Sequence, residues 1–404
     1  MSHDKNQIPS RPLKVLIPDG ETWDAVKSLR CLKQVPTIKT YILSKNRSSL
    51  ARFSRYCACY YQHESKTNDE WIREIKTIVL KEEINVVLPV TLPGVEFISR
   101  SIKSISEFVA VPLLARPELI DITHNKWDFY CLAKERNFPV PPSVFIGRIG
   151  EQIPDSLDID SLDYPLLLKP TTLAGGLGIV KVHNPSELHQ TWKDTRIRKD
   201  CQYMLQSFIP GIAYCLGMYC RGGQIIAYTV SKTLMTSSKR PYYSARILEY
   251  VHDNSIIETG KQLASSLKWD GIVNVDVIID SRDGSVKILD FNPRFWQSLL
   301  GSLVAGVNFP LLVCLDAIGA KYPDMRQNVT KYIHPATHCK LILSHLIGRR
   351  KDISIRWRES GLNFTRSDPF PEIFDTICSV RKKIRLNSFS NDRKKEVPKA
   401  QQCC

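Results

Sequence analysis

Short apolar segments alternate with segments of helical period through the first 115 residues of the chain. Four segments rich in Val, Ile and Leu are typical of buried strands, at residues 14–20, 37–44, 84–90 and 108–114. Three intervening segments repeat their apolar residues with the helical period, at residues 23–34, 69–83 and 94–104. This alternation predicts a parallel sheet with helices on both faces.

The pattern changes after residue 115, where strands follow one another across turns. A helix is expected over residues 116–137, with Thr123 as its N-cap. Further helices are expected over residues 185–198, 255–269 and 306–322, and a last one after a turn at 367–371. Strand pairs lie between them, namely 164–170 with 179–182, two strands around a turn at 221–223, and 274–280 with 286–292. Paired strands of this kind predict an antiparallel sheet.

The strand pair 274–280 and 286–292 carries oxygen-bearing side chains. Asp276 lies on the first strand, while Asp290 and Asn292 share one face of the second, because side chains alternate along a strand. A tight hairpin, with Asp283 in its turn, brings the two carboxylates and the amide together. Mg²⁺ prefers such hard oxygen ligands, and Arg294 could pair with phosphate or carboxylate oxygens in the same cleft. The pattern therefore predicts a metal site, and the alternative is a surface hairpin whose Asp residues only face solvent.

Here the sequence resembles the ATP-grasp superfamily of ligases, whose metal motif is an acidic residue followed on a paired strand by acid-x-Asn-x-Arg. The resemblance covers roughly residues 14 to 330 and implies Asp276, Asp290 and Asn292 as metal ligands, with Arg294 as a catalytic cation. Two residues depart from the family pattern. Asp290 is shorter than the usual Glu, which bears on metal bridging, and Gln297 replaces a Gly, which bears on the shape of the acceptor pocket.

The resemblance also implies which residues hold the nucleotide phosphates. Lys126 matches a cation on a helix that contacts them, although a lone Lys on a helix is usually solvated. Lys169, which also counts among the implied catalytic residues, ends a short apolar strand. The loop that follows contains Gly175, Gly176 and Gly178, whose lack of a side chain lets backbone N–H groups approach phosphate. This loop matches the family's flexible lid, although alone it is equally typical of an ordinary hairpin.

A segment comprising Gln206, Ser207, Phe208 and Ile209 resembles the interdomain strand whose backbone binds the adenine edge. The family often has Glu in place of Gln206 and a second Glu where this chain has Ala213, so contacts to the ribose stay open.

A basic, aromatic stretch at residues 239–246 is expected to be a loop. A similar loop precedes the metal strands in one branch of the superfamily, so the resemblance implies that Arg246 would act as a catalytic cation that neutralises the triphosphate or an anionic substrate. A solvated basic loop explains the stretch equally well.

Composition and charge bound the remaining possibilities. The chain is 43% hydrophobic and 24% charged, which is typical of globular proteins. Much of its net charge of +15 lies after residue 345 without a nucleic-acid-binding module, so we expect no nucleic-acid partner. No signal peptide and no apolar stretch of about 18–20 residues is evident, so no membrane partner is expected. Lipidation of the pair Cys403-Cys404 is the lesser alternative, although the pair is not a C-a-a-X box. The 12 cysteines lack metal-site spacing and are typical of a reducing compartment, which favours the cytoplasm.

Together these patterns and the resemblance predict an α/β protein with the ATP-grasp fold. Residues 1–12 are expected to be a disordered lead, and residues 13–115 a parallel, Rossmann-like pre-ATP-grasp domain. A two-lobed ATP-grasp domain with an antiparallel sheet would follow. Its first lobe, with the glycine-rich lid, is expected at residues 116–200 and its second, with the metal site, at 201–330. Residues 331–404 would form a C-terminal extension and basic tail.

The resemblance implies a ligase that uses ATP and Mg²⁺, with Mn²⁺ as a substitute. A carboxylate would attack the γ-phosphate in line, and an amine would capture the acyl phosphate, releasing ADP and phosphate. A bicarbonate-phosphorylating carboxylase or carbamoyl-phosphate-type enzyme is one alternative, and a catalytically silent nucleotide-binding scaffold is another. The expected partners are a small carboxylic acid and an amine, and a homodimer stays open.

Overall fold

The computed structural model describes residues 12–149, 151, 159, 162–194, 200–237, 240–346 and 356–381, with only the backbone described at 237, 240–244 and 346. Most of the expected lead, residues 195–199 and the end of the basic tail lie outside this part of the chain. Among the described residues, no helix is long and apolar enough to cross a membrane.

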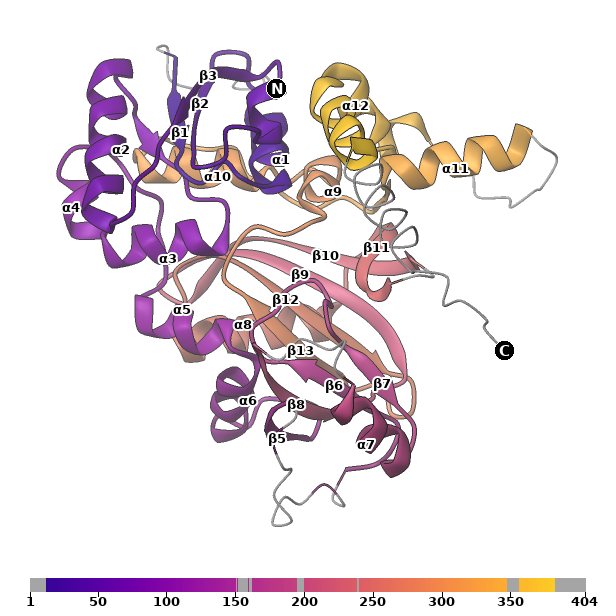
Figure 1. Cartoon of the computed structure of the whole chain (residues 1–404). Helices are drawn as coiled ribbons and strands as arrows, with labels where there is room; N and C mark the ends of the chain where they lie inside the picture. The colour runs from indigo at the N-terminus through magenta and orange to yellow at the C-terminus, as the bar shows by residue number, and fades with distance from the viewer. Residues whose placement is uncertain are drawn as a thin grey trace, which may run out of the picture.

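A four-stranded parallel sheet forms the N-terminal part, as the alternating pattern predicts (Figure 1). Its strand order is β3-β2-β1-β4, and its strands are β1 (Lys14–Ile17), β2 (Lys39–Ser44), β3 (Cys57–Gln62) and β4 (Val86–Val87). The helices of this part are α1 (Trp23–Leu32), α2 (Asn68–Glu82), α3 (Leu92–Arg100) and α4 (Ile102–Ser106), with a 3-10 turn at Leu50–Phe53.

One strand of this part was not predicted, and one predicted strand was wrong. The edge strand β3 was missed, because its Cys and Tyr side chains are only partly covered and lack an apolar signature. Residues 108–114 form no strand of their own, since only Ala110 makes a single bridge, to Val86.

The predicted helix over residues 116–137 is two helices, α5 (Pro117–His124) and α6 (Lys126–Glu135). Asn125 separates them and is the N-cap of α6, because its side chain accepts hydrogen bonds from the next turn's backbone N–H groups. Thr123 is therefore not the N-cap. It lies inside α5, and its hydroxyl donates to the Leu119 carbonyl.

A small antiparallel sheet has the strand order β5-β8-β6-β7. Its strands are β5 (Ser143–Arg148), β6 (Leu166–Pro170), β7 (Val180–Val182) and β8 (Gln202–Ser207), and α7 (Pro185–Lys193) packs against β7. The predicted pairing of residues 164–170 with 179–182 is confirmed.

A larger six-stranded sheet has the order β13-β12-β9-β10-β11-β14. Its strands are β9 (Gly211–Arg221), β10 (Gln224–Ser237), β11 (Arg240–Tyr250), β12 (Gly271–Asp280), β13 (Val286–Asn292) and β14 (Thr330–Ile333). The stretch 239–246 was expected to be a loop, but residues 240–246 belong to β11, which pairs with β10 at Arg240, at Ala245 and from Ile247 to Tyr250. The loop prediction was wrong because strand partners, not local composition, decided the conformation.

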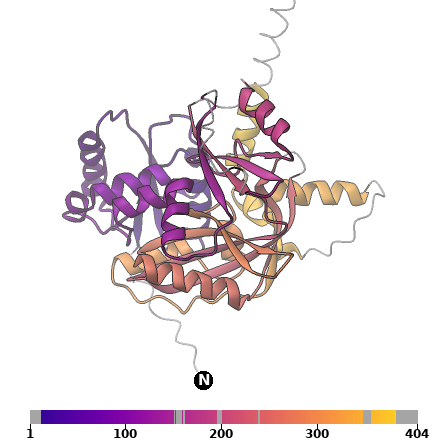
Figure 2. The ribbon, with the colours of Figure 1, turned by 90° about the horizontal axis from the view of Figure 1, so that it is seen from below.

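The two faces of this large sheet are covered differently. On β12 the side chains of Val273, Val275 and Val277 enter an apolar core with α8 (Asn254–Leu267), which lies across the sheet when seen from below (Figure 2). The intervening Asn274 and Asp276 point to the opposite face. The polar face of β12 is therefore turned away from α8.

The chain then returns to the N-terminal sheet. Helices α9 (Leu299–Val304) and α10 (Phe309–Ala317) pack against α1 and share its core, and α10 is shorter than the predicted helix 306–322. The remaining described helices are α11 (Pro335–Leu346), the 3-10 turn Trp357–Glu359, α12 (Leu362–Ser367) and a helix over residues 370–381. This end is fixed beside α1 by a buried ion pair of Arg30 with Asp368 and a half-buried one of Arg30 with Glu372 (Figure 1).

Candidate active site

The β12–β13 hairpin places four polar side chains in a square. Asp276 lies opposite Asp290 in the strand ladder, and Asn274 lies opposite Asn292. On each strand these residues are two positions apart, so all four project from the same face of the sheet. The hairpin therefore brings Asp276, Asp290 and Asn292 together on one face, as the sequence pattern predicts.

A β-bulge at Leu289 makes this arrangement possible. Val277 pairs with Ile288, but the next pair is Asp276 with Asp290, so Leu289 is an extra residue on β13. Ile288 lies in the core beneath α8, and in a regular strand Asp290 would point the same way. The extra residue turns Asp290 to the opposite face, as bulges do where a side chain must be re-aimed.

Asp276 is held by three donors. The amide nitrogens of Asn274 and Asn292 lie 3.1 and 3.2 Å from its two carboxylate oxygens, and the Cys215 thiol lies 3.0 Å from Oδ1. Burial and the nearby Asp290 raise the pKa of Asp276. Asn274 Oδ1 is buried without a hydrogen-bond partner among the described residues. This set of hard oxygen donors suits Mg²⁺.

Two lysines converge on Asp290 from other elements. Lys126 Nζ lies 3.4 Å from its carboxylate, and Lys169 Nζ lies 3.3 Å from the carbonyl of the bulged Leu289. Lys169 is 4% exposed and also donates to Gln206 Oε1 at 2.9 Å. Burial lowers the pKa of Lys169 to about 8, against the opposing effect of Asp290. Both cations are thus held beside the carboxylate pair.

The glycine-rich loop is attached to α6 at its base. Lys126 donates from Nζ to the Leu173 carbonyl at 2.7 Å, and from its backbone N–H to the Thr171 carbonyl at 2.8 Å. Gly175, Gly176 and Gly178 have φ angles of 65°, 70° and 76°, a left-handed conformation that favours glycine. The loop therefore begins beside the cation cluster and needs its glycines for its path.

The segment from Gln206 to Ile209 comprises the end of β8 and the two residues after it, and its last three residues line a cavity of about 310 Å³. Phe208 donates its backbone N–H to the Pro165 carbonyl at 3.1 Å, and Lys181 lies over the Phe208 ring at 3.6 Å. The Gln206 side chain is engaged by Lys169 and donates to Ser143 Oγ at 3.1 Å. The position of this segment at the edge of a cavity suits a planar ligand that is bound by backbone groups.

Residues 123–298 match the family described as the ATP-grasp domain. The chain contains an ATP-grasp domain. Among curated relatives, it is 26% identical over 216 residues to the carbamoyl phosphate synthase large chain of Thermoanaerobacter sp., a match that covers 52% of this chain and 20% of that protein. It is 22% identical over 291 residues to the arginine-specific large chain of Bacillus subtilis, covering 69% and 27%. The chain thus spans only about a fifth to a quarter of these relatives' length.

Solved structures share the fold of the ATP-grasp domain and its N-terminal sheet. Carboxyaminoimidazole ribonucleotide synthase from Aspergillus clavatus, complexed with ATP, superposes with a TM-score of 0.61 at 15% identity, covering 83% of this chain and 86% of that one. The L-amino acid ligase of Bacillus licheniformis superposes with a TM-score of 0.56 at 13% identity, covering 78% and 76%. The predicted α/β fold is confirmed.

The structure places the two predicted catalytic arginines at different distances from the hairpin site. Arg294 is half-buried, donates to the Phe295 carbonyl at 2.8 Å and lies 3.4 Å from Asn292 Oδ1, so it belongs to the hairpin site. Arg246 lies on β11, which β9 and β10 separate from β12. No described contact joins Arg246 to the hairpin residues, and its carbonyl accepts from the His334 N–H. Its catalytic role stays a prediction.

Sequence reasoning missed several supporting residues of this domain. Asn274 alternates with Asp276 on one strand, so the period of two could have found it. Cys215 and Ser143 could not be found in this way, because they reach the site through pairing with distant strands. Within the described ranges, no three His, Cys, Asp or Glu side chains form a metal cluster, and the predicted set has two carboxylates and one amide.

Proposed function

We propose that this protein is a ligase that uses ATP and Mg²⁺ to activate a substrate carboxylate as an acyl phosphate and to join it to an amine. The observation that carries the proposal is the convergence of Lys126 and Lys169 on the Asp276–Asp290 pair, beside the glycine-rich loop. Cations and metal-binding carboxylates at one place are what a triphosphate requires. The similarity to ATP-grasp proteins supports the same class of reaction.

Each residue then has a defined task. Asp276, Asp290 and Asn292 would hold Mg²⁺, which neutralises phosphate charge when bound. Lys126 and Lys169 would place their ammonium groups against phosphate oxygens, and the 175–178 loop would cover the phosphates with its backbone N–H groups. Arg294 would orient the attacking carboxylate in line with the γ-phosphate. These residues position charge, so no covalent nucleophile of the protein is needed.

The test is an ADP-release assay over a matrix of carboxylic acids and amines, with mass spectrometry of the condensed product. We expect ADP release that requires one acid and one amine together. ADP release that depends on neither an acid nor an amine would contradict the ligase. Binding of ATP without turnover under any pair would also contradict it and would favour the nucleotide-binding scaffold.

A second candidate is an enzyme that phosphorylates bicarbonate. The similarity to carbamoyl phosphate synthase large chains favours it, although the chain covers only a part of them. Bicarbonate-dependent ADP release that needs no organic acid would select this candidate over the amide-forming ligase.

A further inference from the structure

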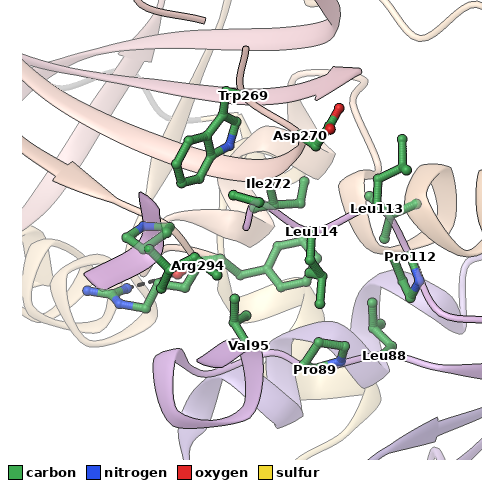
Figure 3. A pocket seen from close by; sticks show the side chains of 15 residues that line it. Leu88, Pro89, Val95, Pro112, Leu113, Leu114, Trp269, Asp270, Ile272 and Arg294 are labelled. Atoms are coloured by element: carbon green, nitrogen blue, oxygen red, sulfur yellow. Dashed lines mark hydrogen bonds between the residues drawn. The ribbon is translucent and has the colours of Figure 1, made fainter. Parts of the chain in front are cut away.

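A small cavity lies where the N-terminal sheet meets the ATP-grasp domain (Figure 3). Its walls include Val95, Leu114 and Ile272, and the indole of Trp269 also lines it. The volume is about 20 Å³, which is room for one water molecule. This cavity is therefore too small for a substrate, and the molecule's other unexplained feature lies on its exterior.

Exposed apolar side chains are concentrated in the C-terminal helical unit, which we define as residues 335–346 and 356–381. The unit holds only about a tenth of the described residues, but half of the exposed large apolar side chains found among them. These side chains are Ile342, Leu343, Trp357, Phe370, Ile373, Ile377 and Val380. Such a concentration on a folded protein marks an interaction surface.

The last helix, residues 370–381, carries four of these side chains as one stripe. Spacings of three and four residues place them on the same side of the helix: Phe370, Ile373, Ile377 and Val380. Other side chains attach this helix to the N-terminal part, because Phe374 stacks on Phe53 with ring centres 3.8 Å apart. Figure 1 shows the unit at the opposite end of the molecule from the small sheet. The stripe is thus presented outward, away from the nucleotide-binding region.

Charges in the C-terminal helical unit are segregated by sign. The described lysines and arginines are all exposed, namely Lys340, Arg356, Arg358, Arg366 and Arg381. The described acidic side chains are all buried or partly buried, namely Glu359, Asp368, Glu372 and Asp375. Asp368 and Glu372 are also neutralised by Arg30. The exposed surface of the unit, as far as the structure describes it, therefore combines apolar and positively charged groups.

Trp357 shows this combination within three residues. It is 50% exposed and lies between the exposed Arg356 and Arg358. Its ring centre is 6.0 Å from that of His338, which joins this turn to α11. Tryptophan is enriched at membrane–water interfaces, where its ring meets acyl chains and its N–H meets water. Arginine can cover apolar surface with its stem while its charged group stays at the headgroups.

We propose that the C-terminal helical unit docks on an anionic membrane surface. Its aliphatic side chains would leave water for the interfacial region of the bilayer, which a nucleic acid does not offer, and its cations would face the lipid headgroups. A second copy of the chain would instead bring like charges together. The sequence continues with Lys382, Lys383 and Arg385, which add charge of the same sign. The sequence-based expectation of no membrane partner considered spanning segments, whereas the fold decides which side chains are exposed.

The experiment measures co-sedimentation of the full chain with vesicles of phosphatidylcholine, alone or with about 30% phosphatidylserine. We expect binding to the phosphatidylserine vesicles to be at least about tenfold tighter, because several cations are attracted to the anionic surface. Raising the salt concentration from about 0.1 to about 0.5 M should weaken this binding several-fold through screening. ATP is left out, so the result does not depend on the proposed ligase reaction.

Two double variants separate the apolar contribution from the charged one. Ile373→Ser with Ile377→Ser removes half of the stripe and should weaken binding to the phosphatidylserine vesicles about tenfold or more. Arg358→Gln with Arg381→Gln removes two exposed charges and should weaken it by a similar factor, with a smaller salt dependence. All four side chains are exposed, so the fold should be kept, which thermal melting checks.

Matched controls lie outside the unit. Leu80→Ser changes an apolar side chain that is 67% exposed on α2. Lys103→Gln with Lys134→Gln removes two exposed charges on α4 and α6. Each control should leave vesicle binding unchanged.

Equal binding to the two kinds of vesicle overturns the inference, and so does binding that Ile373→Ser with Ile377→Ser does not change. Sedimentation equilibrium without vesicles tests the second copy. A dimer that dissociates in this double variant, in a protein that binds no vesicle, would assign the stripe to self-association and overturn the membrane surface.

Discussion

The β12–β13 hairpin and the glycine-rich loop meet at Lys126, which contacts Asp290 of the first and the Leu173 carbonyl of the second. The hairpin is fixed before any ligand binds, because three donors hold Asp276 and strand pairing holds Asp290. The loop residues between positions 173 and 179 make only turn-like hydrogen bonds with each other, at 3.4 Å. The hairpin is therefore a preformed arrangement of charged side chains, whereas the glycine-rich loop is suited to change its conformation when the nucleotide phosphates bind.

Because of this difference, we expect the hairpin and the glycine-rich loop to respond differently to substitution. A change in the hairpin removes preorganised electrostatic stabilisation, which is the larger effect in catalysis. A change in the loop alters the cost of reaching the bound conformation, which acts mainly on nucleotide affinity.

Asp290→Asn should give the largest loss. The amide keeps the size of the side chain but removes the charge that faces Lys126 and any bound metal. We expect turnover to fall about 10²–10³-fold, or roughly 3 to 4 kcal/mol, measured as ADP release under saturating substrates. Asp290→Glu restores the residue usual in the family and should stay near normal.

The control for that prediction is Asp283→Asn, in the exposed hairpin turn, where the side chain accepts hydrogen bonds from the Ser285 backbone N–H and hydroxyl. It should have almost no effect on turnover. Full activity of Asp290→Asn would contradict the predicted metal site. It would also show that the preformed charges of the hairpin are not the larger contribution to catalysis.

Lys169→Ala should weaken the binding of ATP with Mg²⁺ about 10- to 100-fold, because a buried charge-assisted contact to phosphate is lost. Calorimetric titration measures this, and Lys169→Met repeats the test with the side-chain volume kept. Lys193→Ala, an exposed lysine at the end of α7, is the matched control. Unchanged affinity in a folded Lys169 variant would mean that the phosphates lie elsewhere.

Nucleotide affinity should also fall as the pH rises through about 8, where buried Lys169 loses its charge, since its pKa is lowered to about 8 from 10.5. The limit is about tenfold per pH unit above that pKa. The contribution of Lys169 to stability changes in the opposite direction with pH. Between pH 8 and 10.5 the unfolded chain binds more protons, so the free energy of unfolding rises with pH. Titrations at pH 7, 8 and 9 check the slope, which Lys169→Met should abolish.

Gly178→Ala tests the loop and should have the smallest effect. Gly178 has a φ of 76°, and an added Cβ would lie 2.9 Å from Pro170 Cγ, so the loop must shift. We expect the KM for ATP to rise a few-fold with kcat nearly unchanged. Gly222→Ala carries a comparable backbone cost at a φ of 56° with open space around it, and should lower only stability, by about 1–2 kcal/mol. An equal rise in KM for both variants would remove any special role of the loop.

Local patterns in the sequence predicted the features that depend on neighbouring residues. The alternation at residues 14–104 predicted the parallel sheet, and the strand pair at 274–292 predicted the hairpin that joins Asp276 to Asp290. Both depend on periodicity and turn chemistry, which act over a few residues. The path of the 175–178 loop was likewise predictable from its glycines, because its backbone conformation is one that only glycine adopts readily.

Only the tertiary structure decided the features that depend on pairing between distant segments. The bulge at Leu289, which turns Asp290 to the polar face, exists because β13 must pair with β12 while Ile288 stays in the core under α8. The stretch around Arg246 became a strand because β10 was available as its partner. Cys215 reached Asp276, and Trp269 reached a cavity lined by Leu114, through contacts across 61 and 155 residues of sequence. Side-chain periodicity says which face a residue occupies in a regular strand, but it carries no information on which distant segment covers that face.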